Sequence, residues 1–188
     1  MKAMFLALCV MFSGFSQAAL IKFEADKANY QVGDTVSIAV VLSSFSRPVA
    51  TASADFGYTN SFLQFLSAEA GNGFDDGLGS YFDFDSSIDG IFSFSDFADF
   101  FADEAILAAN QGSSFVLATI KFRALDAGFA ELVFDTSTLF ISDFFEEEFA
   151  MESDNLEFNI AAAQVPAPAT ALLLLAGLAC LYRRQQQK

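Results

Sequence analysis

The chain of 188 residues contains no histidine and no tryptophan, and it has only two cysteines. Without histidine, the Ser-His-Asp and Cys-His arrangements of nucleophilic catalysis and the usual zinc sites are excluded. Cys9 and Cys180 lie in apolar segments near the two ends, so the long region between them cannot contain a disulfide. Catalysis by paired carboxylates is the common enzyme chemistry that remains, and a glycan hydrolase of that kind is kept as one hypothesis.

Positive charge is scarce in the region between Leu20 and Gln164. This region carries 24 aspartates and glutamates against five lysines and arginines, a net charge of −19. Such an excess excludes nucleic acid as a partner, because phosphates need cationic groups to neutralise them. It is compatible with solubility outside the cell, with divalent cations and with a calcium-gelled polysaccharide.

The first 18 residues have the organisation of a secretory signal peptide. A lysine at position 2 is followed by the apolar run Met4–Phe15 and by the small-x-small sequence Ser16-Gln17-Ala18. The apolar run is short for a membrane helix and contains a serine and a glycine, which disfavours an N-terminal anchor. Cleavage after Ala18 or after Ala19 fits the pattern equally well, and either one predicts that the rest of the chain is exported.

The last 28 residues, 161–188, combine a linker with a short apolar segment. The apolar run Ala169–Tyr182 has 14 residues, which as a helix would extend about 21 Å. A hydrocarbon core is about 30 Å thick, so the run is short for a permanent anchor. The sequence Val165-Pro166-Ala167-Pro168 stands before it, and Arg183-Arg184 follow and orient the tail toward the cytoplasm.

This order of features resembles the PEP-CTERM sorting signal of Gram-negative bacteria that make exopolysaccharide. Val165, Pro166 and Pro168 match its Val-Pro-Glu-Pro motif, Ala167 stands at the glutamate, and Arg183-Arg184 match the terminal basic cluster. The resemblance implies an exosortase-type processing enzyme as partner and an inner-membrane anchor before processing. It also implies a final place in the cell envelope, on the outer surface or in the extracellular matrix. A plain C-terminal membrane anchor is the alternative.

The region between the two end segments has the periodicity of β-strands. Apolar residues alternate with smaller or polar ones in Thr35–Leu42, in Val116–Phe122, where Val116, Ala118, Ile120 and Phe122 are expected on one face, and in Leu156–Ile160. Period two with one polar face predicts an all-β fold, an antiparallel β-sandwich over residues 20–160. The stretch Asp96–Ala109 lacks this period-two pattern. It is expected to form a short helical excursion, with Phe97, Phe100 and Phe101 on one face.

Three segments resemble the cohesin domain, in the same order as in that family. Tyr30–Ile38 resembles the Val-Gly-Asp turn and the first long strand of that family. Ala54–Leu66 resembles a strand, a turn and the Leu-x-Phe strand that follows, and Leu117–Ala124 resembles the late strand. Thr59 stands where the family usually has aspartate. The resemblance covers about Phe23–Thr136. It implies a jelly-roll sandwich, and its best-known members dock a calcium-loaded dockerin. A generic immunoglobulin-like or fibronectin-like sandwich is the alternative.

The glycine-rich segment from Gly71 to Asp103 contains many aspartates. An EF-hand is rejected, because Ile88 stands where that loop needs glycine and Phe94 where it needs the bidentate glutamate. A looser structural calcium site remains a hypothesis, with ligands from Asp75, Asp76, Asp83, Asp85 and Asp89. The competing interpretation is that Phe82 and Phe84 pack inward while Asp83 and Asp85 are solvated.

Taken together, these patterns predict a non-catalytic binding or interaction protein of the envelope or exopolysaccharide matrix, with an exopolysaccharide or a surface protein as partner. Two alternatives stay open, a structural matrix spacer and a carbohydrate-binding module. A sugar platform would have to use Tyr30, Tyr58 or Tyr81, since tryptophan is absent. The chain has 25 phenylalanines, and a cluster of exposed ones on a flat sheet would instead mark a protein-contact surface.

Overall fold

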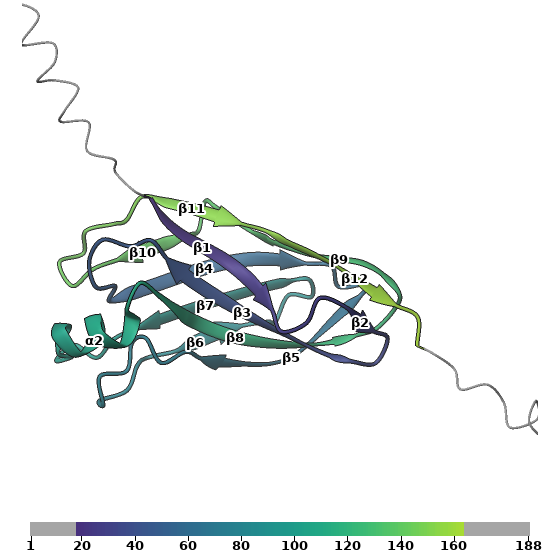
Figure 1. Cartoon of the computed structure of the whole chain (residues 1–188), viewed down its shortest axis with the longest axis horizontal. Coiled ribbons are helices and arrows are strands. Elements are labelled where there is room, and N and C mark those ends of the chain that lie inside the picture. The colour runs from purple at the N-terminus through teal and green to yellow at the C-terminus, as the bar shows by residue number, and fades with distance from the viewer. Residues whose placement is uncertain (1–17, 164–188) are drawn as a thin grey trace, which may run out of the picture.

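The computed structural model describes residues 18–163 (Figure 1). The predicted sorting motif residues, from Val165 to Arg184, and all but the last residue of the predicted signal peptide lie outside the described residues. In the described part, two β-sheets pack face to face and one short helix lies at one end of them (Figure 1). No helix among residues 18–163 is long and apolar enough to cross a membrane.

The first sheet has five strands. Their order across the sheet is β11 (Met151–Asp154), β1 (Ala19–Ala25), β3 (Thr35–Ser43), β8 (Ser114–Ala124) and β5 (Leu63–Ala70). The second sheet has seven strands. Six follow the order β2 (Tyr30–Gln31), β12 (Leu156–Ala161), β9 (Gly128–Phe134), β4 (Thr51–Tyr58), β7 (Ile91–Phe97) and β6 (Asp83–Asp85), and β10 (Phe140–Ser142) pairs with β4 beside β9.

Most strand pairs are antiparallel, as the alternating pattern predicts. Two pairs at the outer strands are parallel: β1 with β11 and β2 with β12. Both partners, β11 and β12, come from the last part of the described chain and close the sandwich around its first strands. The described chain therefore enters the fold at β1 and leaves it at the opposite end of the molecule, after β12 (Figure 1).

The predicted faces of the strands agree with the observed burial at most positions. In β3 the side chains of Val36, Ile38, Val40 and Leu42 are all buried. The prediction for Val116 is wrong, because Val116 is only partly buried and Leu117 takes the inward place. The register shifts between Val40 and Val41, so that β8 has one residue more than its partner there, and the shift reverses the alternation.

Aromatic rings fill much of the space between the sheets. Phe23 of β1 stacks on Phe134 of β9 with ring centroids 4.0 Å apart and 5° between the planes, and its edge meets Phe56 at 5.0 Å. Further pairs join Phe65, Phe92 and Phe122. Each buried ring removes a large apolar area from water. Residues 18–163 contain no cysteine, so the stability of the fold depends on this packed core and not on disulfides.

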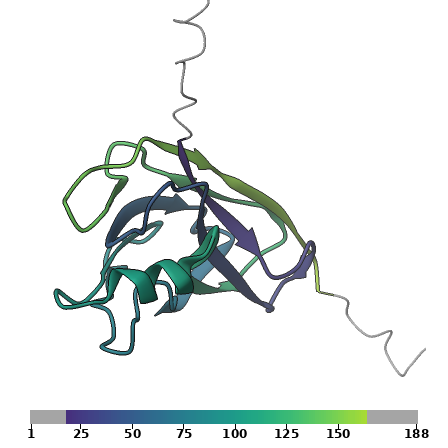
Figure 2. The same cartoon turned by 60° about the vertical axis from the view of Figure 1, so that its left-hand side comes forward.

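The predicted helical excursion exists but begins later than expected. Strand β7 continues to Phe97, because Phe97 pairs with Thr51 and its neighbour with Ala52 of β4. The helix α2 is Glu104–Gln111. Asp103 caps it, accepting hydrogen bonds from the N–H groups of Ala105 and Ile106. The expectation that Phe97, Phe100 and Phe101 share a helical face is therefore wrong. Figure 2 shows α2 and the neighbouring loops at one end of the sheets.

Candidate functional site

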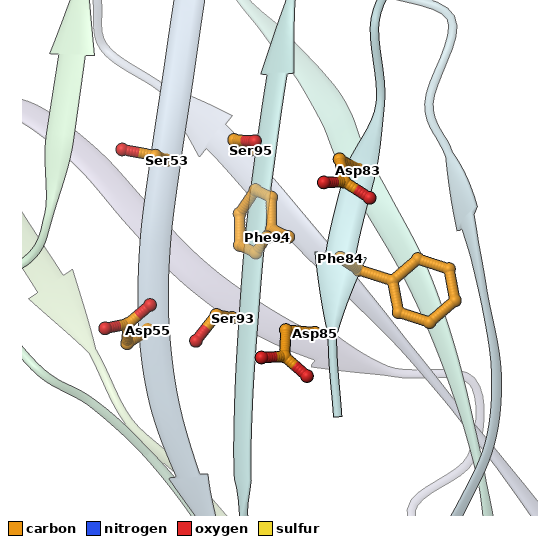
Figure 3. Close-up of a pocket in the computed structure, with 8 residues that line it drawn as sticks. All are labelled: Ser53, Asp55, Asp83, Phe84, Asp85, Ser93, Phe94 and Ser95. Atoms are coloured by element: carbon orange, nitrogen blue, oxygen red, sulfur yellow. The ribbon is translucent and has the colours of Figure 1, made fainter. Parts of the chain in front are cut away.

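The outer face of the second sheet carries a belt of short polar side chains. Opposite residues on neighbouring strands lie on the same face, so the register sets the rows of this belt. One row joins Asp83, Ser95 and Ser53, and the next joins Asp85, Ser93 and Asp55. Figure 3 shows these six side chains on three adjacent strands around a shallow pocket of about 280 Å³. We call them the polar belt.

Exposed apolar side chains lie on both sides of the polar belt. On one side, Phe97 of β7 is 43% exposed, and Phe140 of β10 stands directly opposite Ser53. On the other side, Ile91 of β7 and Val133 of β9 are both partly open to solvent. We call the polar belt and these four residues the binding face. A flat sheet face that combines apolar residues with a polar centre has the composition of a protein-contact surface.

Gly57 forms a notch in the binding face. It is paired with Ile91 on one neighbouring strand and with Val133 on the other. Gly57 has no side chain, and a pocket of about 230 Å³ lies beside it, lined also by Gly90, Glu131 and Val133. A Cβ atom placed on Gly57 would meet only the Gly90 carbonyl oxygen at 3.8 Å, an ordinary contact. The notch is therefore open space on the surface and could hold an apolar side chain of a partner.

The two outer faces of the sandwich differ in charge. The strands of the second sheet contain no lysine or arginine, while Asp55, Asp83, Asp85, Glu131 and Glu157 all lie at least partly exposed on it. The first sheet carries three of the five cations of the domain: Lys22, Lys121 and Arg123. Two of these pair with carboxylates of the same sheet, Lys22 with Glu24 at 2.7 Å and Lys121 with Glu69 at 2.9 Å. Of the two outer faces, that of the second sheet therefore carries the larger excess of negative charge.

The five aspartates of the calcium hypothesis are spread over three places. Asp75 and Asp76 lie in the loop after β5, where their oxygens accept hydrogen bonds from backbone N–H groups, including that of Asp103 at 2.7 Å. Asp83 and Asp85 lie together in the polar belt. Asp89 lies before β7 and accepts a hydrogen bond from the Asn60 amide. In residues 18–163 no group of three or more acidic, histidine or cysteine side chains is arranged to hold a metal.

The competing interpretation of this segment is correct in part. Asp83 and Asp85 are exposed, and Phe82 packs against the core. Phe84, in contrast, is only partly covered, although its ring stacks on Phe92 at 5.7 Å. It remains partly open because β6 is the edge strand of its sheet and has no neighbour on its outer side.

Asp96 is a buried carboxyl outside the binding face. It points inward from β7, it has no exposed surface, and neither carboxylate oxygen has a hydrogen-bond partner. Burial raises the pKa of Asp96 to about 6. A glycan hydrolase also keeps one carboxyl protonated, but its acid must reach the substrate. Asp96 has no route to one, so this group gives no support to the hydrolase hypothesis.

The tyrosines leave a small platform for sugars. Tyr30 and Tyr58 are buried, whereas Tyr81 is 55% exposed and stacks on Phe97 at 5.0 Å with 19° between the rings. Sequence reasoning named Tyr81 but missed its partner, as it also missed Gly57 and the serines of the polar belt. The signal available was the serine and aspartate alternation in β4 and β7, together with the absence of cations from these segments.

The two packed sheets define the class of protein as an all-β jelly-roll sandwich. The cohesin domain model matches residues 21–148, and the chain belongs to the cohesin domain family. No curated protein matches the chain significantly.

Solved cohesin structures have the same fold. A type II cohesin domain from the cellulosome of Acetivibrio cellulolyticus aligns with TM-score 0.63 and 16% identity, covering 75% of this chain and 95% of that one. A non-cellulosomal cohesin from the archaeon Archaeoglobus fulgidus aligns with TM-score 0.58 and 17% identity, over 77% and 91%. The sixth cohesin of scaffoldin B of Acetivibrio cellulolyticus, solved with a mutant Cel5 dockerin, gives TM-score 0.60 and 19% identity, over 78% and 99%.

Membership of this family gives the coarse function. Cohesin domains are non-catalytic modules of protein–protein interaction, typically extracellular or at the cell surface. The chain therefore contains a non-catalytic interaction module. The binding face is the part of the described surface whose geometry suits that role.

Proposed function

We propose that this chain is an exported, surface-sorted binding protein whose cohesin domain takes a protein partner on the binding face. The observation that carries the proposal is the arrangement of this face, with a polar belt between two exposed apolar strips and a notch at Gly57. Partner side chains would fill the notch and cover the apolar strips, while the serines and aspartates fix the register.

The charge of the face indicates the chemistry of the partner. Its strands contain carboxylates and no cation, so a partner surface that carries lysine or arginine is complementary. Several structurally similar cohesins were solved in complex with dockerins. A dockerin-like module with basic residues among its contact side chains is the first candidate partner for this chain.

Export and sorting are part of the same proposal, and their support comes from the two ends of the sequence. The start of β1 adds to it. Ala19 is buried, its N–H donates to the Ala150 carbonyl at 2.8 Å, and it pairs with Met151. Signal cleavage after Ala18 would leave this strand whole, whereas cleavage after Ala19 would remove a core residue. The sorting tail would then place the domain in the envelope or the exopolysaccharide matrix until an exosortase-type enzyme processes it.

Site-specific photo-crosslinking tests where the partner docks. A photoreactive phenylalanine analogue replaces Val133 of the binding face in cells that produce the protein, and a second strain carries it in place of Thr119. Thr119 lies on the outer face of β8 in the other sheet and is partly buried. It therefore serves as a control position in the middle of a strand on the other outer face.

The proposal expects one discrete protein adduct from position 133 that is absent from position 119, and mass spectrometry identifies it. Equal protein adducts at both positions would refute docking on the binding face. A polysaccharide smear at 133 without a protein adduct would favour the carbohydrate-binding alternative, and no adduct at either position would favour the spacer.

A further inference from the structure

A cleft of about 680 Å³ lies at the end of the sandwich that carries α2, beyond the polar belt. We call it the end cleft. The beginning of β4, the end of β7 and the loops after β7 and β10 form its walls. Its volume falls in the range of small-ligand pockets, roughly 300–1,000 Å³. The polar belt and the notch do not include it.

Aromatic rings make up one side of the end cleft. Tyr81 and Phe97 are stacked on each other and both remain about half exposed, and Phe100 at the rim is 90% exposed. The Tyr81 hydroxyl donates to Asp99 Oδ2 at 3.1 Å, and Asp99 Oδ1 accepts the Phe101 N–H at 2.8 Å. These bonds hold the turn, so the aromatic wall is already in place. Open aromatic faces attract organic cations.

The end cleft is also lined by acidic residues. Asp143 is neutralised by its ion pair with Arg47. Asp99 and Glu146 are not, and no lysine or arginine is among the residues that line the cleft. The backbone of Glu146 has φ = 60°, in the left-handed region that non-glycine residues rarely adopt. Glu146 is one of the residues that line the cleft, and within residues 18–163 its carboxylate makes no ion pair or hydrogen bond.

We propose that the end cleft binds a basic side chain of the protein partner, a lysine ammonium or an arginine guanidinium. This rests on the proposed function for the source of the cation. Aromatic faces and two uncompensated carboxylates together form the environment of a cation site. A neutral sugar could stack on the same rings and donate its hydroxyls to the carboxylates, but it would leave their negative charge unneutralised, whereas a cation neutralises it. The cleft would thus select partners with a basic residue beside the docking segment.

Titration with small probes tests the end cleft independently of any protein partner. Backbone amide shifts of the full chain are followed while Nα-acetyl-lysine amide is added, and then Nα-acetyl-norleucine amide, glucose and glucosamine in separate arms. The inference expects the lysine probe to move amides of residues 97–100 and 142–146, and the norleucine probe and glucose to leave them unchanged. The substitution Glu146→Gln should lower the affinity for the lysine probe by about fivefold. Glu148→Gln, the same charge change outside the cleft lining, should not weaken it.

Each contrary result overturns the inference. Equal shifts with norleucine amide would make the cleft merely apolar. Shifts with glucose, or with glucosamine but not lysine amide, would make it a sugar site. If no probe shifts any amide, or if Glu146→Gln binds the lysine probe as tightly as the native chain does, the end cleft is not a cation site. If the lysine probe binds while position 133 yields no protein adduct, the cleft stands and the proposed docking face fails.

Discussion

The Nε atom of Arg47 lies 2.5 Å from the Oδ2 atom of Asp143, and this ion pair joins the segment before β4 to the loop after β10. The Asp143 side chain is only 5% exposed. Burial opposes its ionisation, but the N–H groups of Glu147 and Phe145 and the Arg47 charge outweigh burial, so the pKa of Asp143 is lowered. The pair anchors the loop that forms one wall of the end cleft.

Replacing Arg47 with methionine keeps an unbranched side chain but removes the charged guanidinium, whose Cζ atom lies 4.7 Å from the centre of the Phe149 ring. Because Asp143 would then be a buried carboxylate without its partner, we expect the free energy of unfolding to fall by about 2 kcal/mol. Urea denaturation measures it. Arg123→Met, on the exposed outer face of β8, should change stability by less than about 0.5 kcal/mol. Equal losses in the two variants would contradict a special role for the pair.

We expect Asp96 to make the stability of the fold decrease as pH rises, whereas a carboxylate with a lowered pKa makes it increase. The pKa of Asp96 in the folded state, about 6, lies above the ordinary aspartate pKa of 3.8 because the group is buried. Its contribution to stability is therefore full below pH 3.8 and is lost as pH rises toward 6. Asp96→Asn removes this titration. Its stability relative to the native chain should rise by about 3 kcal/mol between pH 3.5 and pH 7, measured by urea denaturation at both values. A constant difference across that range would mean that Asp96 does not titrate in this way.

The calcium hypothesis stays a prediction. It expects calcium to raise the melting temperature more than magnesium does at equal ionic strength, because a ligand that binds only the native state stabilises it. Asp83→Asn with Asp85→Asn should reduce the difference if the polar belt supplies ligands. Equal shifts with both cations would show only screening of the net charge of −19 between Leu20 and Gln164.

Processing at both ends gives a prediction about mass. The buried position of Ala19 in β1 leads us to expect the mature chain to begin there. The sorting motif leads us to expect it to end near Val165–Pro168, without Arg183 and Arg184. Intact-mass analysis of the extracellular protein tests both ends together. A mature surface protein that keeps Arg183 and Arg184 would contradict exosortase processing.

The sequence was sufficient for those features that depend on local alternation. The buried residues of β3, and the inward Phe158 and Ile160 of β12, follow directly from period-two patterns. The cohesin-like order of segments also agrees with the family found over residues 21–148. In such strands one face is covered by the core, so burial and sequence carry the same information.

The remaining features depend on pairing between distant segments. Val116 faces outward instead of inward because the register between β8 and β3 shifts next to it. Strand β7 extends to Phe97 because Phe97 pairs with Thr51 of β4. The binding face has the same origin. Ser53 and Ser95 are ordinary residues in the sequence, and only the register places them beside Asp83. The serine and aspartate alternation within β4 and β7 marks a polar face on each strand, but only the pairing of three strands joins these residues into a row.

Gly57 offers the most direct test of the central claim that a protein partner docks on the binding face. Gly57→Tyr fills the notch and suits a strand, so stability should not fall. Ala39→Tyr makes a comparable change on the outer face of β3 in the other sheet. Calorimetric titration with the protein recovered from position 133 measures both variants. We predict at least about a tenfold loss of affinity for Gly57→Tyr and native affinity for Ala39→Tyr. Native affinity in a folded Gly57→Tyr variant would contradict the account.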